Sequence, residues 1–147
     1  MMRMNKLTTK LQMALADAQS LALGKDHQFI EPLHILQALL TQSEGTIKPL
    51  LTQAGCQVNA LLRDVALALS QRPQVSGTEG DVQLSNEAVK LLNVSDKLAQ
   101  KRGDQFVSSE LFLLAAAASK GQVASLLKQN GATESVIHRA IEQVFGG

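Results

Sequence analysis

The stretch FIEPLHIL, residues 29–36, decides the fold of this chain, because the chain contains it twice. The second copy is FVSSELFL, residues 106–113, which lies 77 residues further along. Another block, LLTQAG at 50–55, returns as LLKQNG at 126–131, with an offset one residue shorter. Matched blocks in the same order indicate a duplicated structural unit.

Apolar residues recur at three- and four-residue spacing through both copies, which predicts helices with one face on a core. No segment has the alternation of a strand. We therefore predict an all-α fold of eight helices, arranged as two four-helix repeats related by a pseudo-twofold axis, with their inner faces packed together. The helix at 111–118 is apolar on every side and is expected to be the most buried. Hydroxyl residues stand where helices can begin and can cap their free N–H groups: Thr8 or Thr9, Ser85, Ser108 or Ser109, and Thr133.

The boundaries follow from where the periodicity breaks. Residues 1–147 are expected to form one domain, with repeat one at about 7–71 and repeat two at about 84–145. Between them, RPQVSGTEGDVQ at 72–83 contains a proline and two glycines and is expected to be a linker. The final Gly146-Gly147 is expected to begin a second linker, toward the rest of a longer protein.

The composition of the chain excludes some classes of function. The chain has 147 residues, of which 45% are hydrophobic, and its formal net charge is +1. A nucleic-acid surface or a membrane-surface helix would show clustered basic residues, and neither pattern is present. The only cysteine, Cys56, excludes an internal disulfide and is typical of a reducing compartment, so we expect a cytoplasmic protein. No apolar run approaches the ~20 residues that span a bilayer.

An enzyme should show a constellation of reactive groups, and the sequence shows none. The three histidines have no zinc-ligand spacing, and His34, on an apolar helix, is interpreted as a hydrogen-bonded core residue. Cys56 is interpreted as a small packing residue. Ser125 and Lys128 match Ser-x-x-Lys, but the other repeat retains only the leucines between them. There is also no phosphate-binding loop. We therefore predict no metal, nucleotide or other cofactor, and a small helical interaction domain.

Five segments resemble the Clp amino-terminal domain family. They are LTTK at 7–10, ALADAQ at 14–19, QFIEPLH at 28–34, DKLAQKRGD at 96–104 and FVSSELF at 106–112. Within that family they are most similar to the bacterial disaggregase chaperones. The resemblance covers nearly the whole chain and ends where the ATPase modules of the family would begin.

The resemblance implies the substrate-binding N-terminal domain of an ATP-dependent protein disaggregase. Such a domain captures unfolded or aggregated polypeptides for threading. The full-length relative would be an AAA+ ATPase, a homohexamer that works with a DnaK-type chaperone, whereas the isolated domain is expected to be a monomer. The alternative that remains open is an adaptor- or partner-docking N-domain of a related Clp ATPase.

The family positions linked to capture fall on five residues here. Thr8, Asp104 and Glu110 would form a polar set, with Glu110 at the rim of a groove. Leu92 and Leu111 would belong to the apolar groove itself. Each has a structural alternative: a helix cap for Thr8, loop chemistry for Asp104, a first-turn carboxylate on the helix dipole for Glu110, and core packing for both leucines.

Overall fold

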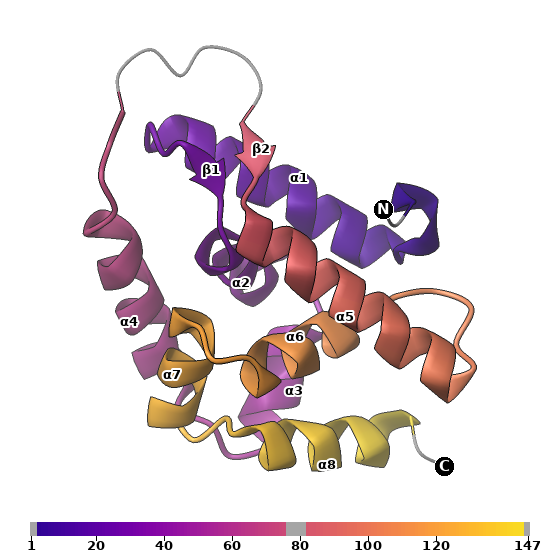
Figure 1. The fold of residues 1–147 in the computed structure, drawn as a ribbon. Coiled ribbons are helices and arrows are strands. Elements are labelled where there is room, and N and C mark those ends of the chain that lie inside the picture. Colours follow the sequence, from indigo (N-terminus) through magenta and orange to yellow (C-terminus); the bar gives the residue numbers. More distant parts are fainter. Residues whose placement is uncertain (1–2, 76–81, 146–147) are drawn as a thin grey trace.

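The computed structural model describes residues 3–75 and 82–145 and confirms the all-α fold. The first repeat consists of a short 3-10 helix η1 (Met4–Lys6), α1 (Thr9–Gly24), β1 (Phe29–Ile30), α2 (Pro32–Thr41), α3 (Ile47–Gln53) and α4 (Val58–Ser70). The second consists of β2 (Gln83–Leu84), α5 (Asn86–Arg102), α6 (Ser109–Ala118), α7 (Gln122–Gln129) and α8 (Glu134–Phe145). Both bounds of α6 lie 77 residues after those of α2, as the duplicated stretch requires. Figure 1 shows α1 and α5 on one side and α3 and α8 on the other.

The expectation of no strands was wrong, because two very short ones join the repeats. β1 pairs in parallel with β2, so that Ile30 lies opposite Leu84. The matching contact is a single bridge between Leu7 and Val107. These four residues are related by the same offset, 7 to 84 and 30 to 107, so each repeat begins against the middle of the other. Strands of two residues show no alternation, which is why the pattern of the sequence did not predict them.

Helix caps confirm several sequence-based predictions. The hydroxyls of Thr8, Ser85 and Ser108 accept hydrogen bonds from the backbone N–H groups of α1, α5 and α6 at 3.1–3.3 Å. Helix α2 begins differently, although it contains the organising stretch. There the N-cap is Glu31, and its backbone N–H donates to Nδ1 of His34 at 2.8 Å. A ring nitrogen thus fills the role that Glu or Gln has in the usual capping box.

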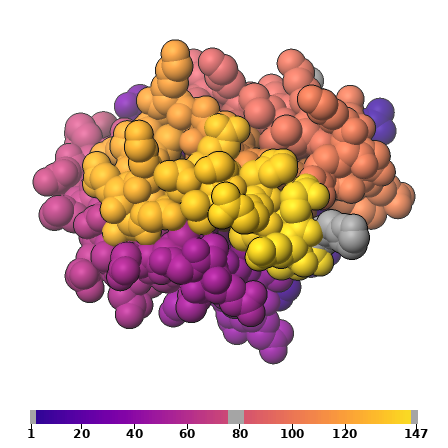
Figure 2. Space-filling model, turned by 90° about the horizontal axis from the view of Figure 1, so that it is seen from below, coloured from indigo at the N-terminus to yellow at the C-terminus, as the bar shows by residue number. Residues whose placement is uncertain are grey.

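The core lies along α2 and α6, which pack on each other at the centre of the molecule (Figure 1). Of the residues 111–118 that were predicted to be buried on every side, 111–116 are buried, whereas Ala117 is half-buried and Ala118 is exposed. Helix α8 packs on α3. Figure 2 shows α8 at the surface of the molecule that is seen from below in Figure 1. Among the described helices, none is by itself long and apolar enough to cross a bilayer.

The expected linker, 72–83, lies only partly within the described residues. Residues 72–75 follow α4 and return toward the loop between α1 and β1, where the backbone N–H of Val75 donates to the carbonyl of Asp26 at 2.9 Å. Residue 83 already belongs to β2. Residues 76–81 lie outside the described part of the chain. The proposed repeat and linker boundaries therefore remain predictions.

Candidate functional site

Two hollows lie along the boundary between α5 and α6. The first, which we call the entry hollow because it adjoins the start of α6, has a volume of about 360 Å³. The second, the α5–α6 groove, lies toward the end of α6 and has a volume of about 590 Å³. The entry hollow is lined by Arg102, Asp104, Phe106, Ser108, Leu111 and Ile141. The groove has an apolar wall of Leu91, Val94, Ala115 and Ala118, with Glu87 and Lys90 at its edge.

Helical periodicity places the two hollows in line. Leu91, Val94 and Arg102 recur at helical spacing on one face of α5, with the half-buried Leu98 between them. On α6, Leu111, Ala115 and Ala118 share a face in the same way. From 91 to 102 an α-helix rises about 16 Å, the length of roughly five residues of extended chain. We call this line, from the groove to the entry hollow, the α5–α6 seam.

Three charged groups surround the entry hollow. The guanidinium of Arg102 donates to Asp104 Oδ2 at 3.2 Å and to Glu142 Oε1 at 2.8 Å. The hydrogen bond with Arg102 lowers the pKa of Glu142, while the hydrogen bonds with Glu142 and then Asp104 raise the pKa of Arg102. Arg102 and Glu142 are therefore both ionised at neutral pH. Because these pairs are exposed, their contribution to stability is small.

The structure brings together two of the five residues that the sequence singled out. Asp104 and Leu111 both line the entry hollow. Leu111 is only 2% exposed, so it also belongs to the core. Leu111 thus lines the hollow and packs in the core, and its role in binding remains a prediction.

The other three residues lie elsewhere. Thr8 caps α1, and its backbone N–H donates to the carbonyl of Val107 at 3.0 Å. Glu110 is in the first turn of α6, as predicted, but it is only 7% exposed, so its expected place at an open rim was wrong. Leu92 is 5% exposed and lines neither of the two hollows. Their role in binding is untested by this geometry and remains a prediction.

The residues that sequence reasoning missed are Leu91 and Val94, which line the groove next to the predicted Leu92. Adjacent helical positions point about 100° apart, so an error of one residue exchanges a groove position for a core position. The spacing of Leu91, Val94 and Leu98 was available as a signal. It did not show which stripe of α5 would face α6 and which would face the interior.

In repeat one, two histidines stand at the positions that correspond to two residues of the entry hollow. Offset by 77, His27 and His34 occupy the positions of Asp104 and Leu111. Both imidazoles are buried, and Nδ1 of His27 lies 2.8 Å from Nε2 of His34. Since Nδ1 of His34 accepts from a backbone N–H, its proton is on Nε2, which donates to His27. The interpretation of His34 as a hydrogen-bonded core residue is thus confirmed.

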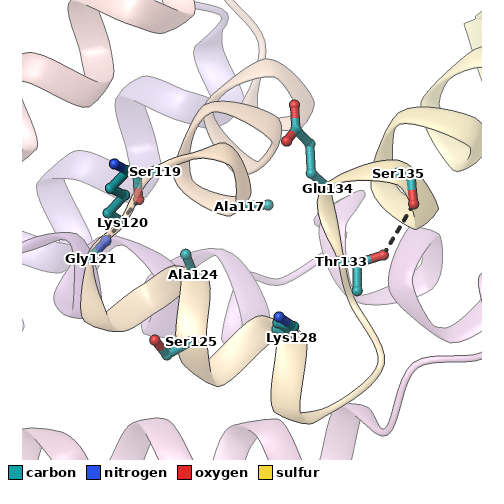
Figure 3. A pocket seen from close by; sticks show the side chains of 10 residues that line it. All are labelled: Ala117, Ser119, Lys120, Gly121, Ala124, Ser125, Lys128, Thr133, Glu134 and Ser135. Atoms are coloured by element: carbon teal, nitrogen blue, oxygen red, sulfur yellow. Dashed lines mark hydrogen bonds between the residues drawn. The ribbon is translucent and has the colours of Figure 1, made fainter.

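A third hollow, of about 520 Å³, lies between the end of α6, α7 and the start of α8 (Figure 3). It holds Ser125 and Lys128, the residues that matched Ser-x-x-Lys. In Figure 3 both lie on the exposed side of α7, and no hydrogen bond joins them. A lysine that activates a serine must lie within hydrogen-bond reach of its hydroxyl. This arrangement does not support nucleophilic catalysis at Ser125.

Metal-ligating and thiol groups also fail to form a reactive site within the described residues. No three of the His, Cys, Asp and Glu side chains there are placed to share an ion. The thiol of Cys56 is half-buried and donates to the carbonyl of Gly131 at 3.4 Å. Burial raises its pKa, which lowers the thiolate fraction at neutral pH. Cys56 is therefore a packing residue of low nucleophilicity.

Comparison with known proteins gives the family of this duplicated all-helical fold. A family model described as the Clp repeat (R) N-terminal domain matches residues 6–130, so the chain belongs to the Clp N-terminal domain family. It is 48% identical to chaperone protein ClpB of Pseudomonas putida and 49% identical to ClpB of Vibrio cholerae. Each match covers 99% of this chain and 17% of the relative, so the chain spans about a sixth of those proteins. It corresponds to their N-terminal region and contains no ATPase domain.

Solved structures share the fold at lower identity. The Hsp104 N-terminal domain of Candida albicans has a TM-score of 0.84 and 22% identity, with 97% of this chain and 93% of that chain covered. The ClpV N-domain of Vibrio cholerae has a TM-score of 0.78 and 21% identity, with 97% and 86% covered. A structure described as a complex of the ClpV N-domain with a VipB peptide has a TM-score of 0.75 and 22% identity, with 97% and 88% covered. These similarities confirm the architecture.

Proposed function

We propose that this domain captures unfolded or aggregated polypeptides for a disaggregase of the ClpB type, and that the α5–α6 seam is where it holds them. The observation that carries the proposal is the pair of hollows along α5 and α6, whose apolar lining includes Leu91 and Val94 in one and Leu111 in the other. Each of its two hollows falls within the size range of natural ligand pockets. An unfolded chain presents extended apolar stretches, and a shallow seam of aliphatic walls with a charged edge accepts these without demanding one sequence.

The whole protein's activity is part of the same proposal. In a full-length relative, an AAA+ ATPase would thread the captured segment, as a homohexamer that works with a DnaK-type chaperone in the cytoplasm. This domain would contribute by raising the local concentration of substrate polypeptide near the ATPase. Weak and sequence-tolerant binding suits that task, because a captured segment must also be released.

We expect Val94→Gln to weaken binding of an unfolded casein chain several-fold while moving the melting temperature by no more than a few degrees. Val94 is half-buried in the groove, so the amide keeps access to water but lowers the apolar area offered to the ligand. The matched control is Val89→Gln, a half-buried valine of the same helix outside the groove. Binding is measured by fluorescence anisotropy of labelled casein, and stability by thermal unfolding. Equal binding by both variants would reject the seam.

The second candidate is docking of one folded adaptor or partner, which the solved ClpV N-domain complex with a peptide favours. The two functions differ in selectivity. Capture predicts weak binding to many unfolded chains and none to their folded forms. Docking predicts tight binding to one partner and no binding to casein. A titration with unfolded and folded forms of the same model protein therefore distinguishes capture from docking.

A further inference from the structure

In repeat one, an extended segment of the chain itself is hydrogen-bonded to the loop that corresponds to the edge of the entry hollow. Residues 72–75, which follow α4, lie over the loop of repeat one that joins α1 to β1. Val75 donates its backbone N–H to the carbonyl of Asp26 at 2.9 Å, and Nε2 of Gln74 donates to the carbonyl of Lys25 at 3.3 Å. Arg72 pairs with Glu31 at 3.5 Å. Most of this docking is made to main-chain carbonyls.

The corresponding loop of repeat two has the same backbone. In repeat one, Asp26 N donates to Leu23 O at 3.1 Å, and the residue after it, His27, donates from N to Ala22 O at 2.9 Å. The equivalent bonds in repeat two run from Gly103 to Gln100 at 3.1 Å and from Asp104 to Ala99 at 2.8 Å. Asp26 and Gly103 both have a positive φ, of 56° and 79°. Offset by 77, the carbonyls of Arg102 and Gly103 therefore occupy the places of those of Lys25 and Asp26.

The two loops differ in whether another segment of the chain binds to their carbonyls. Among the described residues, the carbonyls of Arg102 and Gly103 accept no hydrogen bond outside α5. The two imidazoles of repeat one, which lie edge to face, are replaced by a leucine and by Asp104, an exposed carboxylate bound to Arg102. The space that they leave is the entry hollow, and Phe106, at its edge, is 47% exposed. Repeat two thus offers the same docking loop with an open cavity beneath it.

We propose that the entry hollow binds an extended polypeptide segment through its main chain, in the pose that residues 72–75 adopt on repeat one. A backbone N–H of the ligand donates to the carbonyl of Gly103, and the side chain of the same residue, an aliphatic one like Val75, enters between Phe106, Leu111 and Ile141. A neighbouring side-chain donor reaches the carbonyl of Arg102. This rests on the proposed function and specifies its ligand: any unfolded segment with an aliphatic residue at this position, and not proline, which has no N–H.

The test uses a peptide with the sequence of residues 71–77, QRPQVSG, added to the intact 147-residue domain. Two N-methylated forms are compared: one blocks the amide of Val75, and the other blocks that of Gln74. NMR shifts of the Gly103, Asp104 and Phe106 amides are followed. We expect the unmodified and Gln74-blocked peptides to shift these signals, and the Val75-blocked peptide to bind roughly three- to tenfold more weakly. Equal affinity of the two blocked peptides would overturn the proposal.

Domain variants provide a second control, because the repeats present equivalent phenylalanines at similar exposure. Phe106→Ala should weaken peptide binding, whereas Phe29→Ala, 40% exposed in repeat one, should not. Shifts confined to Asp26 and His27 would mean that the peptide only displaces the linker, and would also overturn the proposal. So would concentration-dependent dimerisation of the free domain that fills the hollow with a second copy.

Casein separates this inference from the function on which it rests. If casein binds and the peptide competes with it, both stand. If casein binds through Val94 but the peptide neither competes nor shifts Gly103, the capture function stands and the main-chain pose fails. If casein does not bind while the peptide follows the expected N-methyl pattern, the pose stands and general capture fails.

Discussion

Leu111→Gln is expected to lower the free energy of unfolding by about 2–4 kcal/mol and, at the same time, to weaken binding of unfolded polypeptides. Leu111 is 2% exposed, so the new amide would be buried without a full set of partners. Leu111 also lines the entry hollow, so in the variant a bound polypeptide would contact a polar amide there instead of an apolar side chain. The two effects should appear together, in urea unfolding and in casein anisotropy measured on the same preparation.

The control is Leu111→Met, which nearly conserves volume and polarity and should change stability by less than about 1.5 kcal/mol while preserving binding. Lost binding at unchanged stability in Leu111→Gln would make this residue a groove residue alone. Lost stability with full binding by the folded fraction would make it a core residue alone. Either result would contradict the dual role that we propose for Leu111.

Acid is expected to destabilise the domain through His34, by on the order of 3 kcal/mol between pH 6.5 and pH 4. Burial, the neighbouring His27 and then Arg72 lower the pKa of His34 to about 4 from the ordinary 6.5. The unfolded chain therefore takes up a proton at a higher pH than the folded one does. Stability is full above pH 6.5 and falls as the pH drops toward 4, below which both states are protonated and the loss is complete.

Urea unfolding at pH 7, 6, 5 and 4.5 measures this slope before most carboxylates titrate. His34→Gln is the informative variant, because glutamine at this capping position can still accept from the N–H of Glu31 but does not titrate. It should remove most of the slope, whereas His138→Gln, at an exposed position, should leave it unchanged. A slope that survives in His34→Gln would place the acid sensitivity in another group.

Local chemistry made much of the fold predictable. The caps at Thr8, Ser85 and Ser108 depend on groups within three residues, and the position of Pro32 at the first turn of α2 depends on its own ring. These requirements are met within a helical turn, wherever the helix later packs. The repeat offset was equally visible, because a duplicated unit retains its spacing. The short strands were not predictable, since each pairs with residues more than 50 positions away.

The candidate site was predictable only in part, because it depends on which side of a helix is covered. Asp104 and Leu111 were identified through the family resemblance and do meet in one hollow. Leu92 was selected where Leu91 and Val94 face α6, and Glu110 is buried rather than at an open rim. The placement of both side chains depends on rotation about a helix axis, which neighbouring helices decide, and the role of Leu92 and Glu110 in binding remains a prediction.

The sequence alone determined that this chain is a pair of matched helical repeats, since periodicity, caps and duplication are properties of neighbouring residues. Only the tertiary structure decided that the two repeats differ in what lies against their equivalent loops. Equivalent loops follow α1 and α5. In repeat one, two hydrogen-bonded imidazoles and an extended segment lie against the loop, whereas in repeat two a leucine and an exposed carboxylate line a hollow. The physical reason is that a cavity is a relation among side chains distant in sequence: its existence depends on what fills the space, and no local pattern records that.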